Sequence, residues 1–166
     1  MSRTRPSLLR AWWPATVWLI MIVGESTDYM SSEHTESALY GILTWLFGQI
    51  NLYDFLIWHH YLRKTGHVIG YAMLCLLLYR GFRMTFGGLR IWERSSAAMA
   101  WVGTFIVASL DEWHQSFIPS RTGTYRDVIL DSTAGLVALL LLYLWVRRAG
   151  PKEPEPVNQA SADAGA

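Results

Sequence analysis

Four long apolar stretches constrain this chain more than any other feature of its sequence. Each contains 15 to 19 residues, and the hydrocarbon core of a bilayer takes about 20 residues of α-helix. The four stretches are Leu8–Gly24, Thr65–Phe82, Ser96–Leu110 and Val128–Val146. They predict an all-α polytopic membrane protein with four transmembrane helices.

The composition favours the same class and excludes others. Only 16% of the 166 residues are charged, whereas soluble domains are nearer a quarter charged. The net charge of +1 argues against a nucleic-acid binder, and the single cysteine, Cys75, excludes a disulfide scaffold. Residues 150–166 are rich in proline and poor in large apolar side chains, which predicts a disordered tail after one membrane domain, 1–149.

The basic residues predict the orientation of the spans, because Lys and Arg are enriched in cytoplasmic loops. Four spans place ten of the 14 basic residues on the side of both termini, and nine of the 13 acidic residues on the other side. The first span begins with basic residues like a signal peptide, but no small-residue cleavage site follows it. We therefore expect it to be retained, with both termini in the cytoplasm.

Residues 38–61 form a further apolar segment between the first two spans, interrupted by Gln49, Asn51 and Asp54. Leucines and Ile50 recur along it at helical spacing, and Trp and Tyr suit the headgroup boundary. This pattern predicts an amphipathic helix that lies along the outer interface or re-enters the membrane. A fifth span would instead put the arginine-rich loop outside.

Polar side chains gather at the outer ends of three predicted spans. Such groups are costly at membrane depth and normally face a partner or a water-filled cavity. Helical spacing puts several members of each group on one face. The groups are Lys64, His67 and Tyr71; Asp111, Glu112, His114 and Gln115; and Asp127, Asp131 and Gly135, with Arg121 in the loop between the last two. We expect them to converge on one outer-leaflet cavity.

Several alternatives remain open for these groups. The carboxylates of Asp127 and Asp131 could simply favour the positive end of a helix dipole, and Asp111 could pair with a cation to brace the bundle. A metal site built from His67, Asp111 and His114 is conceivable. However, the sequence has no HExxH motif and no paired cysteines, so we expect neither a metal nor another cofactor.

Two separated motifs resemble the VanZ-like family of bacterial integral membrane proteins. The first runs from Asp111 to Gly135 and has the order Asp-Glu-x-x-Gln, Pro-x-Arg, Asp, Asn or Asp, and Gly. The second is Lys-x-x-His-x-x-x-Tyr, which begins at Lys64. Asp131 occupies a position where many members have Asn. The resemblance implies a bacterial inner-membrane protein of the cell envelope, related to one that confers low-level resistance to the glycopeptide teicoplanin.

Three functions follow as expectations. In the preferred interpretation, the protein is not an enzyme and lies among membrane lipids. Its cavity binds an anionic headgroup, a lipid-linked precursor or a glycopeptide. The residues expected to bind the ligand are Lys64, His67, Tyr71, Asp111, Glu112, Gln115, Arg121, Asp127 and Asp131. A membrane-embedded hydrolase or transferase is the alternative, with Asp111, Glu112 and His114 as candidate catalytic residues. The third is a structural partner in an envelope complex.

Overall fold

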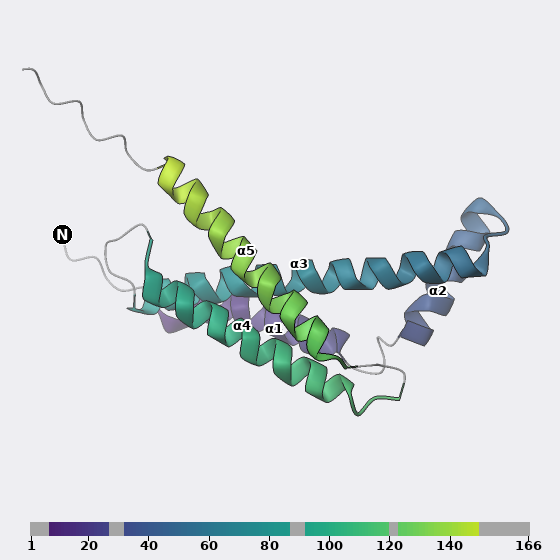
Figure 1. The fold of residues 1–166 in the computed structure, drawn as a ribbon, viewed down its shortest axis with the longest axis horizontal. Coiled ribbons are helices and arrows are strands. Elements are labelled where there is room, and N and C mark those ends of the chain that lie inside the picture. The colour runs from purple at the N-terminus through teal and green to yellow at the C-terminus, as the bar shows by residue number, and fades with distance from the viewer. Residues whose placement is uncertain (1–6, 27–31, 87–91, 120–122, 150–166) are drawn as a thin grey trace, which may run out of the picture.

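The computed structural model describes residues 7–26, 32–86, 92–119 and 123–149, with side chains in the second range described from residue 37. The described chain is all-helical and contains no strand. The five helices are α1 (Leu8–Glu25), α2 (Ser32–Phe47), α3 (Leu52–Phe86), α4 (Arg94–Gln115) and α5 (Tyr125–Ala149) (Figure 1). The predicted all-α class is therefore confirmed. The predicted tail, 150–166, and Arg121 lie outside the described residues.

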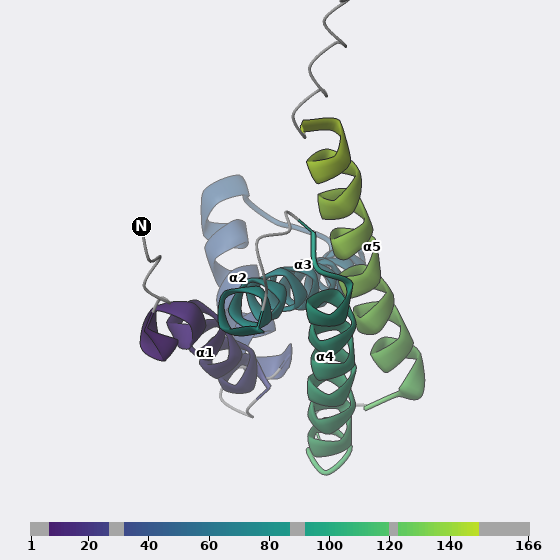
Figure 2. The same ribbon diagram turned by 90° about the vertical axis from the view of Figure 1, so that its left-hand side faces the viewer.

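Helix α3 is the centre of the bundle. It packs against α1 on one side and against α4 and α5 on the other, and α4 and α5 also pack against each other (Figure 2). Small buried residues on α4, Ser96, Ala100, Thr104 and Ala108, recur every four residues and form one face. Small residues at helix interfaces let backbones approach closely, so α4 can lie near both neighbours.

Contacts at the two ends of the bundle show that consecutive bundle helices are antiparallel. At one end, Asp111 near the end of α4 accepts a hydrogen bond from Tyr71, well before the end of α3. Its neighbour Glu112 accepts one from Thr124, just before α5. At the other end, Trp12 near the start of α1 donates a hydrogen bond to Thr85 near the end of α3. The described polar groups that were expected at the outer ends of the spans therefore share one end of the bundle.

The segment 38–61 differs from the predicted single amphipathic helix. It is divided between α2 and the first part of α3 by a turn at residues 48–51. Gly48 has φ +84°, the left-handed conformation in which glycine commonly ends a helix. Asn51 then accepts a hydrogen bond from the backbone N–H of Tyr53 and starts α3, while Tyr40 donates to the carbonyl of Ile50 across the turn. The result is a helical hairpin.

Helix α3 is longer than the predicted second span. Its 35 residues extend about 52 Å, whereas a bilayer core is about 30 Å thick. Figure 1 shows its first part extending beyond the bundle together with α2. The predicted span at residues 65–82 lies within the part of α3 that packs in the bundle, which contacts α5 at Lys64 and α1 at Thr85.

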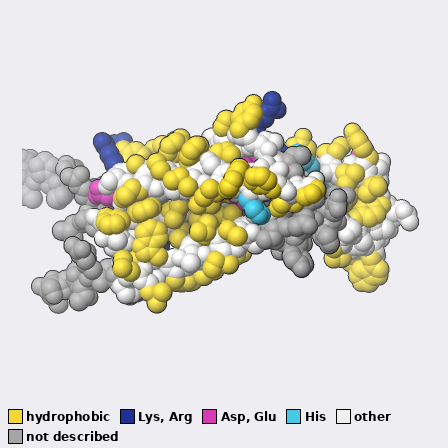
Figure 3. Space-filling model, turned by 90° about the horizontal axis from the view of Figure 1, so that it is seen from below, with side chains coloured by type: hydrophobic (Ala, Val, Ile, Leu, Met, Phe, Trp, Pro, Cys, Tyr) yellow, Lys and Arg dark blue, Asp and Glu magenta, His cyan; other side chains and the backbone are white. Residues whose placement is uncertain are grey.

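By length and apolar composition, two of the described helices could cross a membrane, α3 and α5. Helices α1 and α4 are not apolar enough to meet the same criterion, because α4 ends in the charged sequence DEWHQ and the 18 residues of α1 include Arg10 and Glu25. Large apolar side chains such as Leu9, Ile20 and Leu141 are nonetheless exposed on the bundle. Apolar side chains also dominate the face drawn in Figure 3, where charged groups are few.

Candidate functional site

The candidate site lies where α3, α4 and the start of α5 meet. On α3, Lys64, His67 and Tyr71 follow one another at intervals of three and four residues, and all three turn toward α4 and α5. Their described partners are Asp127, Asp131 and Asp111, respectively. These contacts agree with the prediction that the three residues lie on one face of the helix.

The Asp111 carboxylate is held by two hydrogen bonds. The hydroxyl of Tyr71 donates to its Oδ2 at 2.8 Å, and Nε2 of Gln115 donates to the same oxygen at 3.1 Å. All three residues are buried. Because hydrogen bonds to a charged acceptor are stronger than neutral ones, Asp111 is a fixed part of the site.

The start of α5 is joined to the end of α4 through Thr124. Its backbone N–H donates to Glu112 Oε2 at 2.8 Å, and its hydroxyl donates to Asp127 Oδ2 at 3.0 Å. The Asp127 N–H lies 3.3 Å from the same hydroxyl oxygen. Thr124 thus caps α5. Asp127 lies in the first turn of α5, where its carboxylate interacts favourably with the positive end of the helix dipole, one of the structural roles considered from the sequence.

Gly123 is required by this junction. A Cβ at this position would lie 2.1 Å from the carbonyl oxygen of Glu112 and 2.9 Å from the backbone nitrogen of Ser116. Backbone atoms cannot move aside as a flexible side chain can. The loop can therefore approach the end of α4, and bring Thr124 to Glu112, only with glycine here.

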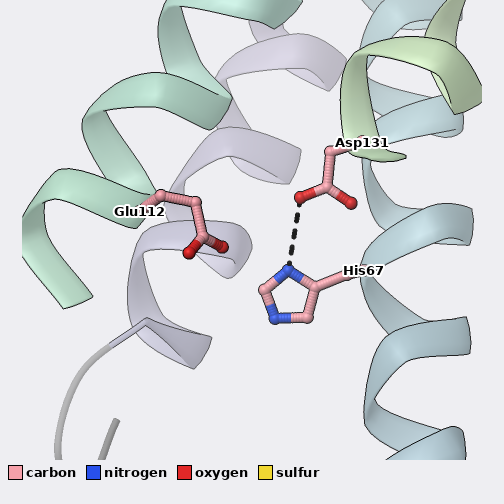
Figure 4. A group of neighbouring side chains, drawn as sticks. All are labelled: His67, Glu112 and Asp131. Carbon is pink, nitrogen blue, oxygen red and sulfur yellow. Dashed lines mark ion pairs between the residues drawn. The ribbon is translucent and has the colours of Figure 1, made fainter. Parts of the chain in front are cut away.

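His67, Glu112 and Asp131 form a second group within the site. They come from α3, α4 and α5, and both carboxylates face the imidazole ring (Figure 4). His67 Nδ1 lies 3.6 Å from Asp131 Oδ2. Asp131 is completely buried, and neither of its carboxylate oxygens accepts a hydrogen bond from any described residue.

The electrostatic surroundings of the site are acidic. Four carboxylates converge in the site, those of Asp111, Glu112, Asp127 and Asp131. Among the site residues that the structure describes, Lys64 carries the positive charge, and it is bonded to Asp127. Burial raises the pKa of Glu112, which lies beyond the predicted third span, and the N–H of Thr124 opposes this shift. A positive charge placed between these carboxylates would be strongly favoured.

His114 does not join the group. Its ring lies on the side of α4 that faces the end of α1, where Nδ1 is 3.4 Å from the hydroxyl of Ser26, and the residue is exposed. Asp111 and Glu112, the other candidate catalytic residues, are both buried in the site. The imidazole that the structure places near these carboxylates is that of His67.

A small cavity lies beside the site in the described part of the chain. It has a volume of about 20 Å³ and is lined by His67, Tyr71 and Asp111 together with residues from the end of α1 and from α3. This volume accommodates about one water molecule. A headgroup would therefore have to bind at the rim, where the side chain of Lys64 is 42% exposed.

Sequence reasoning did not identify Thr124 as a site residue, or Glu112 as a neighbour of His67 and Asp131. A signal for Thr124 was present, because a Thr followed three residues later by an acidic residue before an apolar run is typical of a helix N-terminus. A signal for Glu112 was present as well, because Glu112 continues by four residues the small-residue spacing of Ser96, Ala100, Thr104 and Ala108. Which helices that face meets depends on tertiary packing.

Comparison with known proteins agrees with the two motifs. The sequence model of the VanZ/LLP1 family matches residues 11–146. This range includes α2 to α4 complete, and nearly all of α1 and α5. No curated protein and no solved structure matches the chain significantly. The family match covers most of the chain, and the chain therefore belongs to the VanZ-like (VanZ/LLP1) family.

Proposed function

We propose that this protein is a multi-pass inner-membrane protein of the bacterial cell envelope, with four spans and both termini in the cytoplasm. The antiparallel bundle, its exposed apolar side chains and the uneven distribution of basic residues support this arrangement. In this orientation the polar site lies at the level of the outer leaflet.

The proposed function is the binding of an anionic or lipid-linked envelope ligand at this site. The observation that carries the proposal is the convergence of ionisable side chains from three helices inside an otherwise apolar bundle. Ionisable groups at membrane depth are costly and usually mark a pathway or binding site for an ion or a substrate. A brace would need only one ion pair, whereas this site contains four carboxylates.

Lys64 is the described residue best placed to contact an anion. An ammonium group has three N–H donors, and one of them is used by Asp127. The side chain is partly exposed at the rim of the site, so the remaining donors can reach a headgroup whose chain lies along the apolar bundle. Arg121 would supply the second contact with its planar guanidinium.

Binding can be measured with the full chain purified in detergent, using its tryptophan fluorescence. The probes are phosphatidylglycerol as a lipid headgroup, undecaprenyl phosphate as a lipid-linked anion, and teicoplanin as a glycopeptide. We expect saturable binding of at least one probe, weakened about tenfold or more by Lys64→Gln.

Arg83→Gln is the matched control, because it removes one positive charge from an exposed position at the opposite end of α3. It should leave binding unchanged. Equal effects of the two substitutions would show that the probes bind through general charge attraction and not at the site, which would contradict the proposal. Absence of saturable binding by all three probes would refute the proposed function.

Hydrolysis or group transfer on a lipid-linked substrate is a second candidate. It is favoured by the pairing of His67 with Asp131, since a carboxylate beside an imidazole orients a general base, and by the water-sized cavity next to them. Release of phosphate from undecaprenyl pyrophosphate, abolished by His67→Gln, would support it. Turnover that persists in His67→Gln would exclude His67 as the base.

A further inference from the structure

We propose that His67, Glu112 and Asp131 bind a divalent transition cation such as Zn²⁺ or Mn²⁺. This goes beyond ligand binding at the rim, and it differs from the sequence-based expectation of no metal. One imidazole and two carboxylates are ordinary ligands for these ions. They come from three helices, so a bound ion would join α3, α4 and α5 at one point.

The spacing of the donor atoms fits one ion after a small adjustment. One ligand atom from each residue lies within 4.8 Å of the other two. Ligands about 2.1 Å from a tetrahedral ion are about 3.4 Å apart, and His67 Nδ1 and Asp131 Oδ2 are already separated by 3.6 Å. Glu112 has the longest side chain of the three, and rotation about its side-chain bonds can bring its carboxylate closer.

Asp131 is the independent observation that points to a bound cation. Its side chain is 1% exposed, and neither oxygen accepts a hydrogen bond within the described chain. A buried ionised carboxylate is costly unless it is paired, hydrogen-bonded or coordinated to a metal. Lys64, the nearby described cation, bonds to Asp127 instead. The described ionic partner of Asp131 is the imidazole of His67, 3.6 Å away, which is itself one of the proposed ligands.

The surrounding charges also favour a divalent ion over a proton on His67. Asp111 and Asp127 lie close to the three ligands, so four carboxylates face this region in all. One imidazolium would offset a single negative charge, and a divalent cation offsets two. The cavity beside His67 has room for about one water, which can complete a coordination shell that three protein ligands leave open.

The ligand set predicts which ions bind best. An imidazole nitrogen favours transition metals over Mg²⁺, which prefers oxygen ligands and keeps its waters. Zn²⁺ should bind more tightly than Mn²⁺, following the usual order of divalent affinities. Mg²⁺ at the same concentration should bind least.

The test uses the full chain in detergent, stripped with EDTA and titrated with Zn²⁺, Mn²⁺ and Mg²⁺ by calorimetry. We expect one Zn²⁺ per chain. At a free concentration about 100-fold above Kd, Zn²⁺ should raise the folding equilibrium constant about 100-fold, because unfolding separates ligands from three helices.

Asp131→Asn separates a cation site from a simple ion pair. If Asp131 is a metal ligand, this nearly isosteric change should lower Zn²⁺ affinity about 100-fold or more, and the metal-free variant should be at least as stable as the metal-free wild type. If Asp131 is only the ion-pair partner of protonated His67, the variant should be less stable than wild type, and neither protein should respond to Zn²⁺. Circular dichroism checks that the variant remains helical.

His60→Ala is the matched control, because His60 is an exposed histidine on the same helix. Zn²⁺ binding should survive His60→Ala and be lost in His67→Ala. Absence of stoichiometric Zn²⁺ and Mn²⁺ binding in the wild type, or binding unchanged in both Asp131→Asn and His67→Ala, would overturn the proposal. The lipid-binding test at Lys64 has a separate readout, so either conclusion can fail alone.

Discussion

Gly135 offers a quantitative test of how closely the helices that carry the site are packed. A Cβ at this position would lie 3.1 Å from Cβ and 3.2 Å from Sγ of Cys75 on α3, and 3.3 Å from Cγ2 of Thr104 on α4. Both neighbours are fully buried. Cβ of Cys75 is fixed by the α3 backbone and cannot rotate away, so Gly135→Ala has to push α5 outward.

The expected cost of Gly135→Ala follows from two opposing effects. Overpacking a close contact costs about 1–3 kcal/mol, whereas Gly→Ala within a helix gains about 0.5–1 kcal/mol. The free energy of unfolding should therefore fall by up to about 2.5 kcal/mol. Because Asp131 lies one helical turn before Gly135, the outward shift of α5 should also weaken Zn²⁺ binding.

Gly66→Ala is the control for helix propensity. Gly66 lies within α3, and no atom lies within 4 Å of the position its Cβ would take. This substitution should raise the free energy of unfolding by about 0.5–1 kcal/mol. Both variants can be unfolded reversibly with SDS in mixed micelles and followed by circular dichroism. A Gly135→Ala protein as stable as the Gly66→Ala protein would refute the close approach of α5 to α3.

Two further predictions concern α1 and the topology. Arg80→Leu should lower the free energy of unfolding by about 1 kcal/mol. The Arg80 guanidinium donates hydrogen bonds to the carbonyl oxygens of Ala11 and Arg10 in α1, and the Arg10 carbonyl has no helical donor because Pro14 lacks an N–H. The loss should shrink in a Pro14→Ala background, and an equal loss in both backgrounds would contradict this explanation. In a Cys75→Ser background, a membrane-impermeant thiol reagent should label Asn51→Cys in intact cells and Ser95→Cys only after permeabilisation. The reverse pattern would disprove the proposed orientation.

The sequence determined the features that depend on spacing along one helix. Apolar length predicted the helices of the bundle, and intervals of three and four residues placed Lys64, His67 and Tyr71 on one face. The positions of turns within an apolar segment are harder to predict from such spacing. The apolar pattern of residues 38–61 continues across the turn, whereas the left-handed conformation of Gly48 ends α2 there and produces a hairpin.

Only the tertiary structure decided which helix faces meet. Glu112 and His114 are two residues apart, about 200° around a helix, so a single face of α4 cannot carry both. The small-residue spacing puts Glu112 on the interface side of α4, but it does not say which helices that side meets. Packing of the small-residue face of α4 turns Glu112 into the bundle and leaves His114 beside Ser26 at the end of α1. Burial of Asp131 without a hydrogen-bond donor follows from the same packing, because α5 approaches α3 and α4 closely at Gly135. The rotation and separation of helices depend on contacts between residues far apart in the sequence, and those contacts placed Glu112 and Asp131 around His67.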